Sequence, residues 1–324
     1  MAALTEFELI DRFFRRPCRS AVLGVGDDAA LLRPSLGCEI AVSVDMLVAG
    51  RHFFEDVDPE SLGHKTLAVN LSDMAAMGAT PRWALLAGAL PQARSEWLAA
   101  FARGFFALAD AHGVELVGGD TTRGPLTLCV TIIGEVPQGQ ALRRSGAKPG
   151  DAIWVSGPLG DAALAVAHRS RDIELTSAEL ASCERALQRP NARVALGERL
   201  RAVATAAIDL SDGLTGDLGH VMEESHVGAR VRLAAIPRSA AMETRLRGPH
   251  REAALRCLLA GGDDYELCFT APADSRTRIE ALDREIGLGL SRVGVITEGS
   301  GLHIEDETGR RLESIPHAYD HFLE

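Results

Sequence analysis

Six short segments of this sequence place aspartate at or near the end of an apolar or small-residue stretch, usually beside glycine or serine. They are GVGDDAALL (24–32), SVDM (43–46), NLSDMAAMG (70–78), GGDTTRG (118–124), IDLSDGL (208–214) and GGDDYEL (261–267). Apolar stretches are buried in folded proteins, whereas carboxylates stay solvated or find a partner. The chain must therefore fold so that the ends of many strands or helices carry carboxylates.

Strand-like and helix-like segments alternate along both halves of the chain, which predicts an α/β (α+β) protein. Helices are expected over 6–16, where Thr5 and Glu8 have capping-box spacing, over 59–77 with Asp58 as N-cap, and over 95–112 capped by Ser95. Further helices are expected over 160–168, 177–187, 191–204, 214–224, 251–259 and 275–286. Strands are expected over 39–45, 83–90, 114–119, 126–136, 152–157, 206–209, 229–233, 265–270, 291–296 and 302–306.

The stretch RRSGAKPGD (143–151) is polar and rich in turn formers. It predicts a joint between two domains, 1–142 and 143–324, and the length of 324 residues suits two domains. Short elements recur across this joint, such as LSD at 71–73 and 210–212 and GGD at 118–120 and 261–263. Either a duplication or similar turns serving similar ligands would explain the recurrence.

Composition excludes several classes of protein. The formal net charge of −11 argues against a nucleic-acid or anionic-membrane surface, which needs clustered Lys and Arg. The six cysteines form no C-x-x-C pair, so a reduced, cytoplasmic protein is expected. The N-terminus lacks the features of a signal peptide, and no segment approaches the length of a membrane span.

Two common nucleotide motifs do not explain the chain. There is no G-x-x-x-x-G-K-[ST] loop. The stretch GVGDDA matches a relaxed dinucleotide fingerprint, but it would set Asp27 and Asp28 against a pyrophosphate, where bare amide donors are needed. A nicotinamide site is therefore disfavoured.

The aspartates themselves point to a divalent cation. Any one of them could be an N-cap or part of an Asx turn. As a set they would repel one another and raise their pKa values unless cations neutralise them. Mg²⁺ is held by a few carboxylates together with phosphates and waters. Several such ions with a polyphosphate imply phosphoryl transfer, in which catalysis is mainly positioning and charge neutralisation.

The motifs, taken in order, resemble a known family. GVGDDAALL, SVDMLVAGRHF, HKTLAVNLSDMAAMGATP, GGDTTRGPL, RSGAKPGD, AIDLSDGLTGDLGH and GGDDYELCFT are similar to the successive motifs of the thiamine-monophosphate kinase family. That family lies within the aminoimidazole ribonucleotide synthetase superfamily. The resemblance implies a two-domain fold of that superfamily. Domain 1–142 would bind nucleotide and metals and form a homodimer interface, and domain 143–324 would complete the active site.

The resemblance also implies a reaction: ATP phosphorylates thiamine monophosphate directly and in line, giving thiamine diphosphate, with several Mg²⁺ ions. The metal positions it implies are Asp28, Ser43, Val44, Asp45, Asp73, Asp120, Asp209 and Asp212. The nucleotide contacts it implies are Gly119, Asp120, Arg144 and Ser211. The substrate contacts it implies are His52, Asp263 and Tyr319. Asp120 and Asp212 are the expected catalytic residues.

Two positions depart from the family pattern. Val44 stands where the family often has Thr, so it could bind metal only through its backbone carbonyl. Asp263 stands where many relatives carry Glu, so its side chain reaches one methylene less. Structural roles remain open for some of these residues: His52 could pack beside two phenylalanines, Tyr319 could anchor the tail, and Arg144 could lie in a solvated turn. Asp263 could cap its turn while Asp264 points to solvent.

The acceptor implied by the resemblance is itself a phosphate. Its second ionisation lies near pH 6, so the attacking oxygen is largely an anion at neutral pH and needs no strong general base. The difficulty lies in bringing two polyanions together, which the aspartate-held cations would solve. Rival functions are a selenophosphate or aminoimidazole ribonucleotide synthetase, and a non-catalytic, metal-dependent maturation or binding protein.

Overall fold

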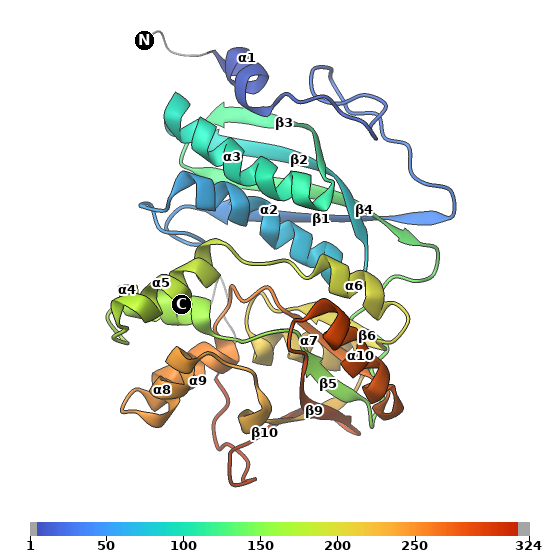
Figure 1. Cartoon of the computed structure of the whole chain (residues 1–324), viewed down its shortest axis with the longest axis vertical. Coiled ribbons are helices and arrows are strands. Elements are labelled where there is room, and N and C mark those ends of the chain that lie inside the picture. The colour runs from blue at the N-terminus through green and yellow to red at the C-terminus, as the bar shows by residue number, and fades with distance from the viewer. Residues whose placement is uncertain (1–4, 317–324) are drawn as a thin grey trace. The chain divides into compact units, whose positions relative to one another are not determined.

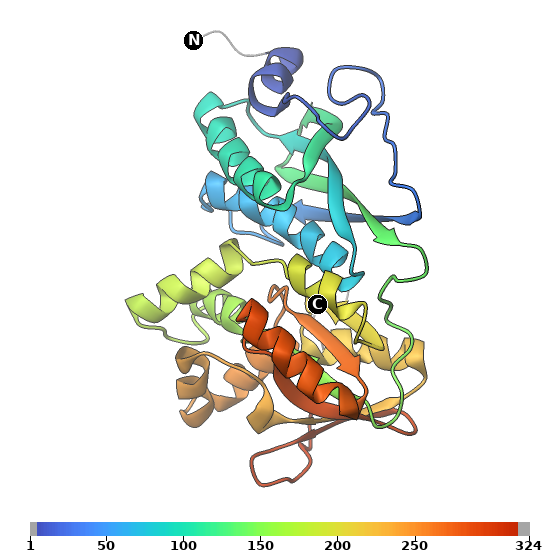
Figure 2. The same ribbon diagram turned by 45° about the vertical axis from the view of Figure 1, so that its right-hand side comes forward.

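The computed structural model describes residues 5–316 and divides into two compact units (Figures 1 and 2). Unit 1 comprises Met1–Met74 and Ala79–Gln140, and unit 2 comprises Ala75–Gly78 and Ala141–Glu324. Both units combine a mixed β-sheet with helices. The expected α+β class with two domains is therefore confirmed.

Unit 1 is built on a four-stranded sheet in the order β1-β4-β2-β3, in which only the β2–β3 pairing is parallel. Two long helices, α2 and α3, lie side by side against this sheet (Figures 1 and 2). The elements of unit 1 are α1 (Glu6–Leu9), η1 (Ile10–Phe14), β1 (Cys38–Val48), α2 (Pro59–Ala76), β2 (Thr80–Leu90), α3 (Ser95–His112), β3 (Glu115–Arg123) and β4 (Thr127–Pro137). The last two residues of α2, Ala75 and Ala76, already belong to unit 2.

Two glycines let α2 and α3 approach closely. A Cβ atom added to Gly63 would lie 2.0 Å from the carbonyl oxygen of Phe101, and one added to Gly104 would lie 1.8 Å from that of Glu60. Neither position has room for a side chain. The backbones of the two helices therefore pack directly against each other, and α2 is buried along almost its whole length.

Strand β1 exposes its apolar side chains and turns its polar ones toward a helix, the reverse of the usual arrangement in which apolar side chains face the core. The side chains of Ile40, Val42, Val44 and Met46 are exposed, at 43–61%. The intervening residues Ser43, Asp45 and Leu47 point to the other face, which α2 covers, because successive side chains alternate across a strand. The register with β4 places Ile133, Thr131 and Cys129 beside the exposed residues. We call this surface the open apolar face of unit 1.

Unit 2 is built on a six-stranded mixed sheet in the order β10-β7-β9-β5-β8-β6. Strands β5, β6 and β8 are buried on both faces. Its elements are β5 (Ala152–Val155), α4 (Asp161–Arg169), α5 (Ser177–Gln188), α6 (Val194–Leu200), β6 (Ala206–Asp209), α7 (Leu214–Ser225), β7 (Gly228–Arg232), η2 (Leu233–Ala235), α8 (Ala240–Arg247), α9 (Arg251–Ala260), β8 (Leu267–Ala271), η3 (Ala273–Ser275), α10 (Arg276–Ile286), β9 (Ser291–Thr297) and β10 (Gly301–Glu305).

Every predicted strand is present within a few residues, and most helices begin where the sequence predicts. The Thr5–Glu8 capping box forms, and the Asp58 carboxylate accepts the Ser61 N–H at 2.8 Å. The first helix is wrong beyond Leu9, because residues 10–14 are π-helical. Hydrogen bonds from i to i+5 bring residues five apart to one side, which suits the buried pair Leu9 and Phe14.

Three other helix predictions need correction. Ser95 is the first helical residue and not the cap, because the N-cap position is Arg94, which makes no side-chain capping bond. The helix expected over 191–204 is limited to α6, since residues 201–203 form a turn. Helix α8 was not predicted, although Ser239 caps it by accepting the Met242 N–H.

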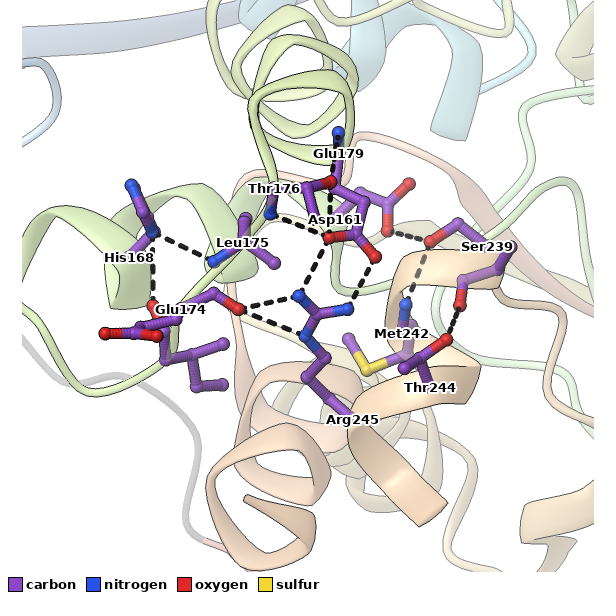
Figure 3. A network of polar contacts seen from close by, with 12 residues as sticks. Asp161, His168, Glu174, Leu175, Thr176, Glu179, Ser239, Met242, Thr244 and Arg245 are labelled. Atoms are coloured by element: carbon purple, nitrogen blue, oxygen red, sulfur yellow. Dashed lines mark hydrogen bonds and ion pairs between the residues drawn. The ribbon is translucent and has the colours of Figure 1, made fainter. Parts of the chain in front are cut away.

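A polar network joins α4, α5 and α8 in unit 2 (Figure 3). The Arg245 guanidinium donates to both carboxylate oxygens of Glu179, at 2.5 and 2.8 Å, and to the carbonyl oxygen of Glu174. Glu179 also closes a capping box with Thr176. The Arg245 bonds come first among the causes that lower the Glu179 pKa to about 2. This clamp ties α5 to α8, and the Ser239 hydroxyl at the start of α8 donates to Asp161 of α4 at 2.6 Å.

All six cysteines are free thiols. Burial raises the pKa of Cys183 and Cys268 to about 12 and that of Cys257 to about 11, so these thiols stay protonated. Among residues 5–316, no helix combines the length and the apolar character that a membrane crossing requires.

Candidate active site

In unit 1 the structure brings together three of the predicted metal positions. Ser43 and Asp45 share the face of β1 that α2 covers, and the Ser43 hydroxyl donates to Oδ2 of Asp73 on α2 at 2.5 Å. Asp73 therefore lies inside its helix and is not an N-cap. The Val44 side chain points to the opposite face, so only its backbone could reach a ligand shared with Ser43 and Asp45.

His52 lies in a tight turn directly after β1. Its Nδ1 accepts the Val48 N–H at 3.0 Å, and its carbonyl oxygen accepts a bond from Lys65 at 3.2 Å. An accepting Nδ1 places the proton of the neutral ring on Nε2. The ring is thus held by the backbone of β1 and is half-buried, which fits both the packing role and the substrate-contact role.

Asp120 does not join Ser43 and Asp45 within unit 1. It lies on β3, whereas Asp45 lies on β1, and these strands form opposite edges of the sheet. Three strand spacings separate them, about 14 Å. The strand register aligns Asp120 with Ala87, Cys129 and Met46, which places it on the open apolar face.

Gly119 keeps β3 close to β2 at this point. A Cβ atom at Gly119 would lie 1.8 Å from the carbonyl oxygen of Leu86, and its φ of +153° is one that other residues rarely adopt. A side chain at this position would therefore push β3 away from β2 and displace Asp120.

Two more of the predicted residues are exposed. Asp28 is exposed in the loop before β1, and its carboxylate makes no hydrogen bond or ion pair with the residues that the structure describes. Arg144 is exposed in the joint after β4, where its carbonyl oxygen accepts the Ser225 hydroxyl. Tyr319 lies outside the described residues.

In unit 2 the backbone joins two of the predicted motifs. The N–H of Asp263 donates to the carbonyl oxygen of Ser211 at 2.9 Å, and that of Tyr265 donates to Leu210 at 2.8 Å. Gly262 permits this contact, since a Cβ there would lie 2.4 Å from the Ser211 oxygen. The segments LSD (210–212) and GGDDYE (261–266) therefore lie against each other at the end of β6.

The glycines before Asp263 serve close packing rather than an unusual φ. The left-handed backbone conformation falls instead on Asp263, with φ of +68°, and on Tyr265, with φ of +50°. Such conformations cost free energy in non-glycine residues and concentrate at functional sites. The strand that follows this turn, β8, is fully buried, and it begins at Leu267, two residues after the predicted start.

A third carboxylate accompanies Asp209 and Asp212. Asp217, in the first turns of α7, accepts the Asp212 N–H at 3.1 Å. Burial, followed by the negative charges of Asp209 and Asp212, raises the pKa of Asp217 to about 8. Asp217 was not among the predicted site residues, although it stands only five positions after Asp212.

Asp264 and Glu266 were also missed. Oδ1 of Asp264 accepts the Gly160 N–H at 2.8 Å, and its Oδ2 is solvent-inaccessible without a partner among the described residues. The alternative in which Asp264 points to solvent is therefore wrong. Burial raises the Asp264 pKa well above its usual range. Glu266 forms a bidentate ion pair with Arg193 and accepts the Ser156 hydroxyl.

Carboxylates and a serine hydroxyl are the donors that suit Mg²⁺. Like charges gathered around Asp217 cost free energy that a cation would remove. Within residues 5–316, no three His, Cys, Asp or Glu side chains converge as a complete metal centre. The donor chemistry thus fits Mg²⁺ with other ligands, such as phosphates and waters, completing its coordination.

Comparisons with known proteins match two family domains to this chain. The N-terminal domain of AIR synthase related proteins matches residues 26–136, and their C-terminal domain matches residues 148–307. The chain is 45% identical to thiamine-monophosphate kinase of Salmonella typhimurium over 328 residues, covering 99% of both chains.

Two solved structures share the fold along nearly the whole chain. The crystal structure of thiamine-monophosphate kinase from Stenotrophomonas maltophilia superposes with a TM-score of 0.85 at 48% identity, covering 95% of this chain and 98% of that one. The structure of AaThiL complexed with AMPPCP and TMP has a TM-score of 0.77 at 27% identity, covering 98% and 97%. With both domains matched and these identities over its length, the chain belongs to the thiamine-monophosphate kinase family, an AIR synthase-related family of phosphotransferases.

Proposed function

We propose that this protein transfers the γ-phosphoryl group of ATP to thiamine monophosphate, giving thiamine diphosphate and ADP, in the cytoplasm. The observation that carries the proposal is the 45% identity to a thiamine-monophosphate kinase over 99% of the chain. The complex of a relative with AMPPCP, an analogue of ATP, and TMP supports the same pair of substrates.

The acceptor oxygen attacks without help from a strong base. A phosphate monoester has its second pKa near 6, so this oxygen is mostly ionised at neutral pH. The transferred group passes in line from one phosphate to the other, and the protein must hold two polyanions against their mutual repulsion. Carboxylates alone would worsen that repulsion, so their purpose is to hold cations.

The residues proposed to hold Mg²⁺ come from both units. They are Asp28, Ser43, Val44 through its carbonyl, Asp45, Asp73, Asp120, Asp209 and Asp212. When bound, Mg²⁺ would neutralise phosphate charge and align the reacting oxygens. The Ser43 hydroxyl orients the Asp73 carboxylate, and Asp217 holds the backbone of Asp212 by accepting its N–H.

Nucleotide and substrate contacts are proposed for a second group of residues. Gly119, Asp120, Arg144 and Ser211 would contact ATP, with Arg144 suited to phosphate oxygens by its planar guanidinium. His52, Asp263 and Tyr319 would contact thiamine monophosphate. Asp120 and Asp212 are the proposed catalytic residues, because they would hold charge at the transferring group.

The open apolar face of unit 1 supports a homodimer. A sheet face that exposes Ile40, Val42, Val44 and Met46 side by side is unusual for a surface in water. A second copy of the chain would bury this face. Asp120 lies on the same face, so the dimer interface would run beside a proposed ligand-binding residue.

One rival function within the superfamily, a selenophosphate synthetase, lacks support in the described residues. A selenophosphate-type enzyme would need a reactive cysteine near the N-terminus. Burial and the charge of Glu115 raise the pKa of Cys18, and its Sγ lies 3.7 Å from the Leu116 carbonyl oxygen. Cys18 is therefore a poor nucleophile.

One coupled assay tests the proposal. ADP formation is followed with ATP and Mg²⁺ in the presence of thiamine monophosphate, thiamine or buffer alone, and thiamine diphosphate is identified by mass spectrometry. Of these three conditions, we expect turnover only with thiamine monophosphate. We expect no turnover after chelation of divalent ions. ADP release that ignores the acceptor, or full activity with chelator, would contradict the proposal.

A further inference from the structure

Unit 2 carries a cavity of about 370 Å³ on the outer face of its sheet. Strands β7, β9 and β10 form this part of the sheet. The lining residues are Arg230, Arg232, Arg292, Gly294, Val295 and Glu305. Three of the six are arginines, in a chain whose formal net charge is −11.

The alternation of β7 places two of these arginines together. In the segment ARVRL, Ala229 and Val231 are buried, whereas Arg230 and Arg232 are exposed on the opposite face. The register of β10 sets Glu305 beside Arg232, and antiparallel β9 sets Val295 beside Arg230. Arg292 stands near the start of β9 and reaches the same cavity.

Acidic residues do not balance this cluster. Glu305 lies 3.8 Å from Arg230, a distance at the outer limit of an ion pair. Arg232 and Arg292 make no ion pair or side-chain hydrogen bond with any residue from 5 to 316. Three guanidinium groups that line one cavity repel one another. A cluster of arginines that lowers stability and makes few compensating contacts points to a ligand of opposite charge.

The cavity is separate from the candidate active site in the same unit. Asp209 ends β6, at the far edge of the sheet from β10. Three strand spacings separate β6 from β9 and four separate it from β7, about 14 and 19 Å. The arginines therefore do not serve the Asp209–Asp212 carboxylates.

We propose that this cavity is a second, phosphate-binding site for a small phosphorylated molecule of the nucleotide or diphosphate class. Guanidinium groups bind phosphate oxygens bidentately, and two of the three here are available for that. A volume of about 370 Å³ falls in the range of small-molecule sites. The acidic chain as a whole disfavours a nucleic acid, which would need a far larger basic surface.

Arginine footprinting on the full-length, unmodified protein tests the site directly. Phenylglyoxal modification is measured residue by residue by mass spectrometry, with inorganic diphosphate, ATP or no ligand present and without Mg²⁺. We expect diphosphate to slow the modification of Arg232 and Arg292 at least fivefold. Arg247 and Arg276 are matched controls, because both are exposed helix arginines of unit 2 and should react at unchanged rates.

The outcomes separate the ligand sources and can overturn the proposal. Protection by both diphosphate and ATP means that the site recognises phosphate groups. Protection by ATP alone means that it also recognises the nucleoside. No protection, or equal slowing at all four arginines, overturns the proposal. In calorimetry, the double variant Arg232→Ala/Arg292→Ala should bind one diphosphate per chain fewer than the wild type. The double variant Arg247→Ala/Arg276→Ala should bind as many as the wild type. Neither experiment needs turnover, so both are independent of the proposed kinase activity.

Discussion

The hydroxyl of Ser43 on β1 lies 2.5 Å from Oδ2 of Asp73 on α2, and this hydrogen bond fixes a carboxylate of a buried helix from an edge strand. A charge-assisted bond of this kind sets the direction of the carboxylate oxygens. Mutating a partner that orients a metal ligand typically lowers metal affinity or activity by about 10- to 100-fold.

We expect Ser43→Ala to raise the Mg²⁺ concentration needed for half-maximal rate by about tenfold or more, because Asp73 loses its orienting donor. Initial rates over a Mg²⁺ titration measure the change. Ser95→Ala, at the start of α3, is the matched control and should leave the titration unchanged. A wild-type Mg²⁺ response in Ser43→Ala would leave this hydrogen bond a purely structural role.

Asp45→Asn and Asp120→Asn should each nearly abolish turnover while the protein remains folded. Each change removes a charge that would hold metal at the phosphates, worth a few kcal/mol in the barrier. Steady-state kinetics and circular dichroism measure the two properties. Asp110→Asn in unit 1 is the control, since it breaks only an exposed ion pair with Arg16. A near wild-type kcat in either site variant would return that residue to a structural role.

Asp263→Asn should raise the KM for thiamine monophosphate by about tenfold, the scale of a partly buried charge contact of roughly 1–2 kcal/mol. Thiamine monophosphate carries a fixed thiazolium cation and ATP does not, so the KM for ATP should barely change. Kinetics with each substrate varied in turn decide the matter, with the exposed Asp274→Asn as control. Equal weakening for both substrates, or for neither, would show that Asp263 does not recognise the cation.

Val44→Glu should convert a dimer into a monomer of 34.5 kDa, because it places a charge in the middle of the open apolar face. Light scattering at several concentrations gives the mass. Leu36→Glu is the matched control, since Leu36 is fully exposed outside the sheet and should leave the mass unchanged. A wild-type mass of 34.5 kDa at all concentrations would contradict the dimer itself.

Glu179→Gln should lower the free energy of unfolding at pH 7 by about 1–3 kcal/mol, since Glu179 accepts charged bonds from Arg245 of α8. Its pKa is about 2 in the folded state against 4.5 ordinarily, so its contribution is complete above about pH 5.5 and is lost as the pH falls through 4.5 toward 2. The gap between wild type and Glu179→Gln should therefore shrink by about 1 kcal/mol between pH 7 and pH 4.

Urea unfolding at both pH values measures this gap. Asp161 of α4 belongs to the same network and has a pKa raised by burial, but it is present in both proteins and cancels. Glu174→Gln is the matched control, because Glu174 meets Arg245 only through its carbonyl oxygen. A gap that stays constant with pH would mean that the Glu179 charge does not stabilise the fold.

Much of this structure follows from local sequence rules. Strand alternation and capping signals gave nearly every element, and the aspartate positions gave Asp45, Asp73, Asp209 and Asp212 as candidates. The face of each strand was harder to predict. The sequence SVDM places Ser43 and Asp45 on one face, but nothing in it says that the helices cover the polar face and leave the valines exposed.

Long-range contacts account for what the sequence did not reveal. Asp264 looks like a turn residue beside Asp263, and its burial depends on Gly160, more than a hundred positions away. The Arg193–Glu266 pair and the Arg245–Glu179 clamp likewise join residues more than sixty positions apart. The separation of Asp120 from Asp45 depends on strand order, which the sequence does not encode locally.

The reversed alternation of β1 limits how this protein can vary. Because side chains alternate with a period of two, deleting or inserting one residue within the strand would turn Ser43 and Asp45 outward and the valines toward α2. Such a change would lose the carboxylate position and the apolar surface in one step, and no point mutation elsewhere could restore both. Length variation among functional variants should therefore be confined to the flanking loops, and β1 should keep its length of 11 residues.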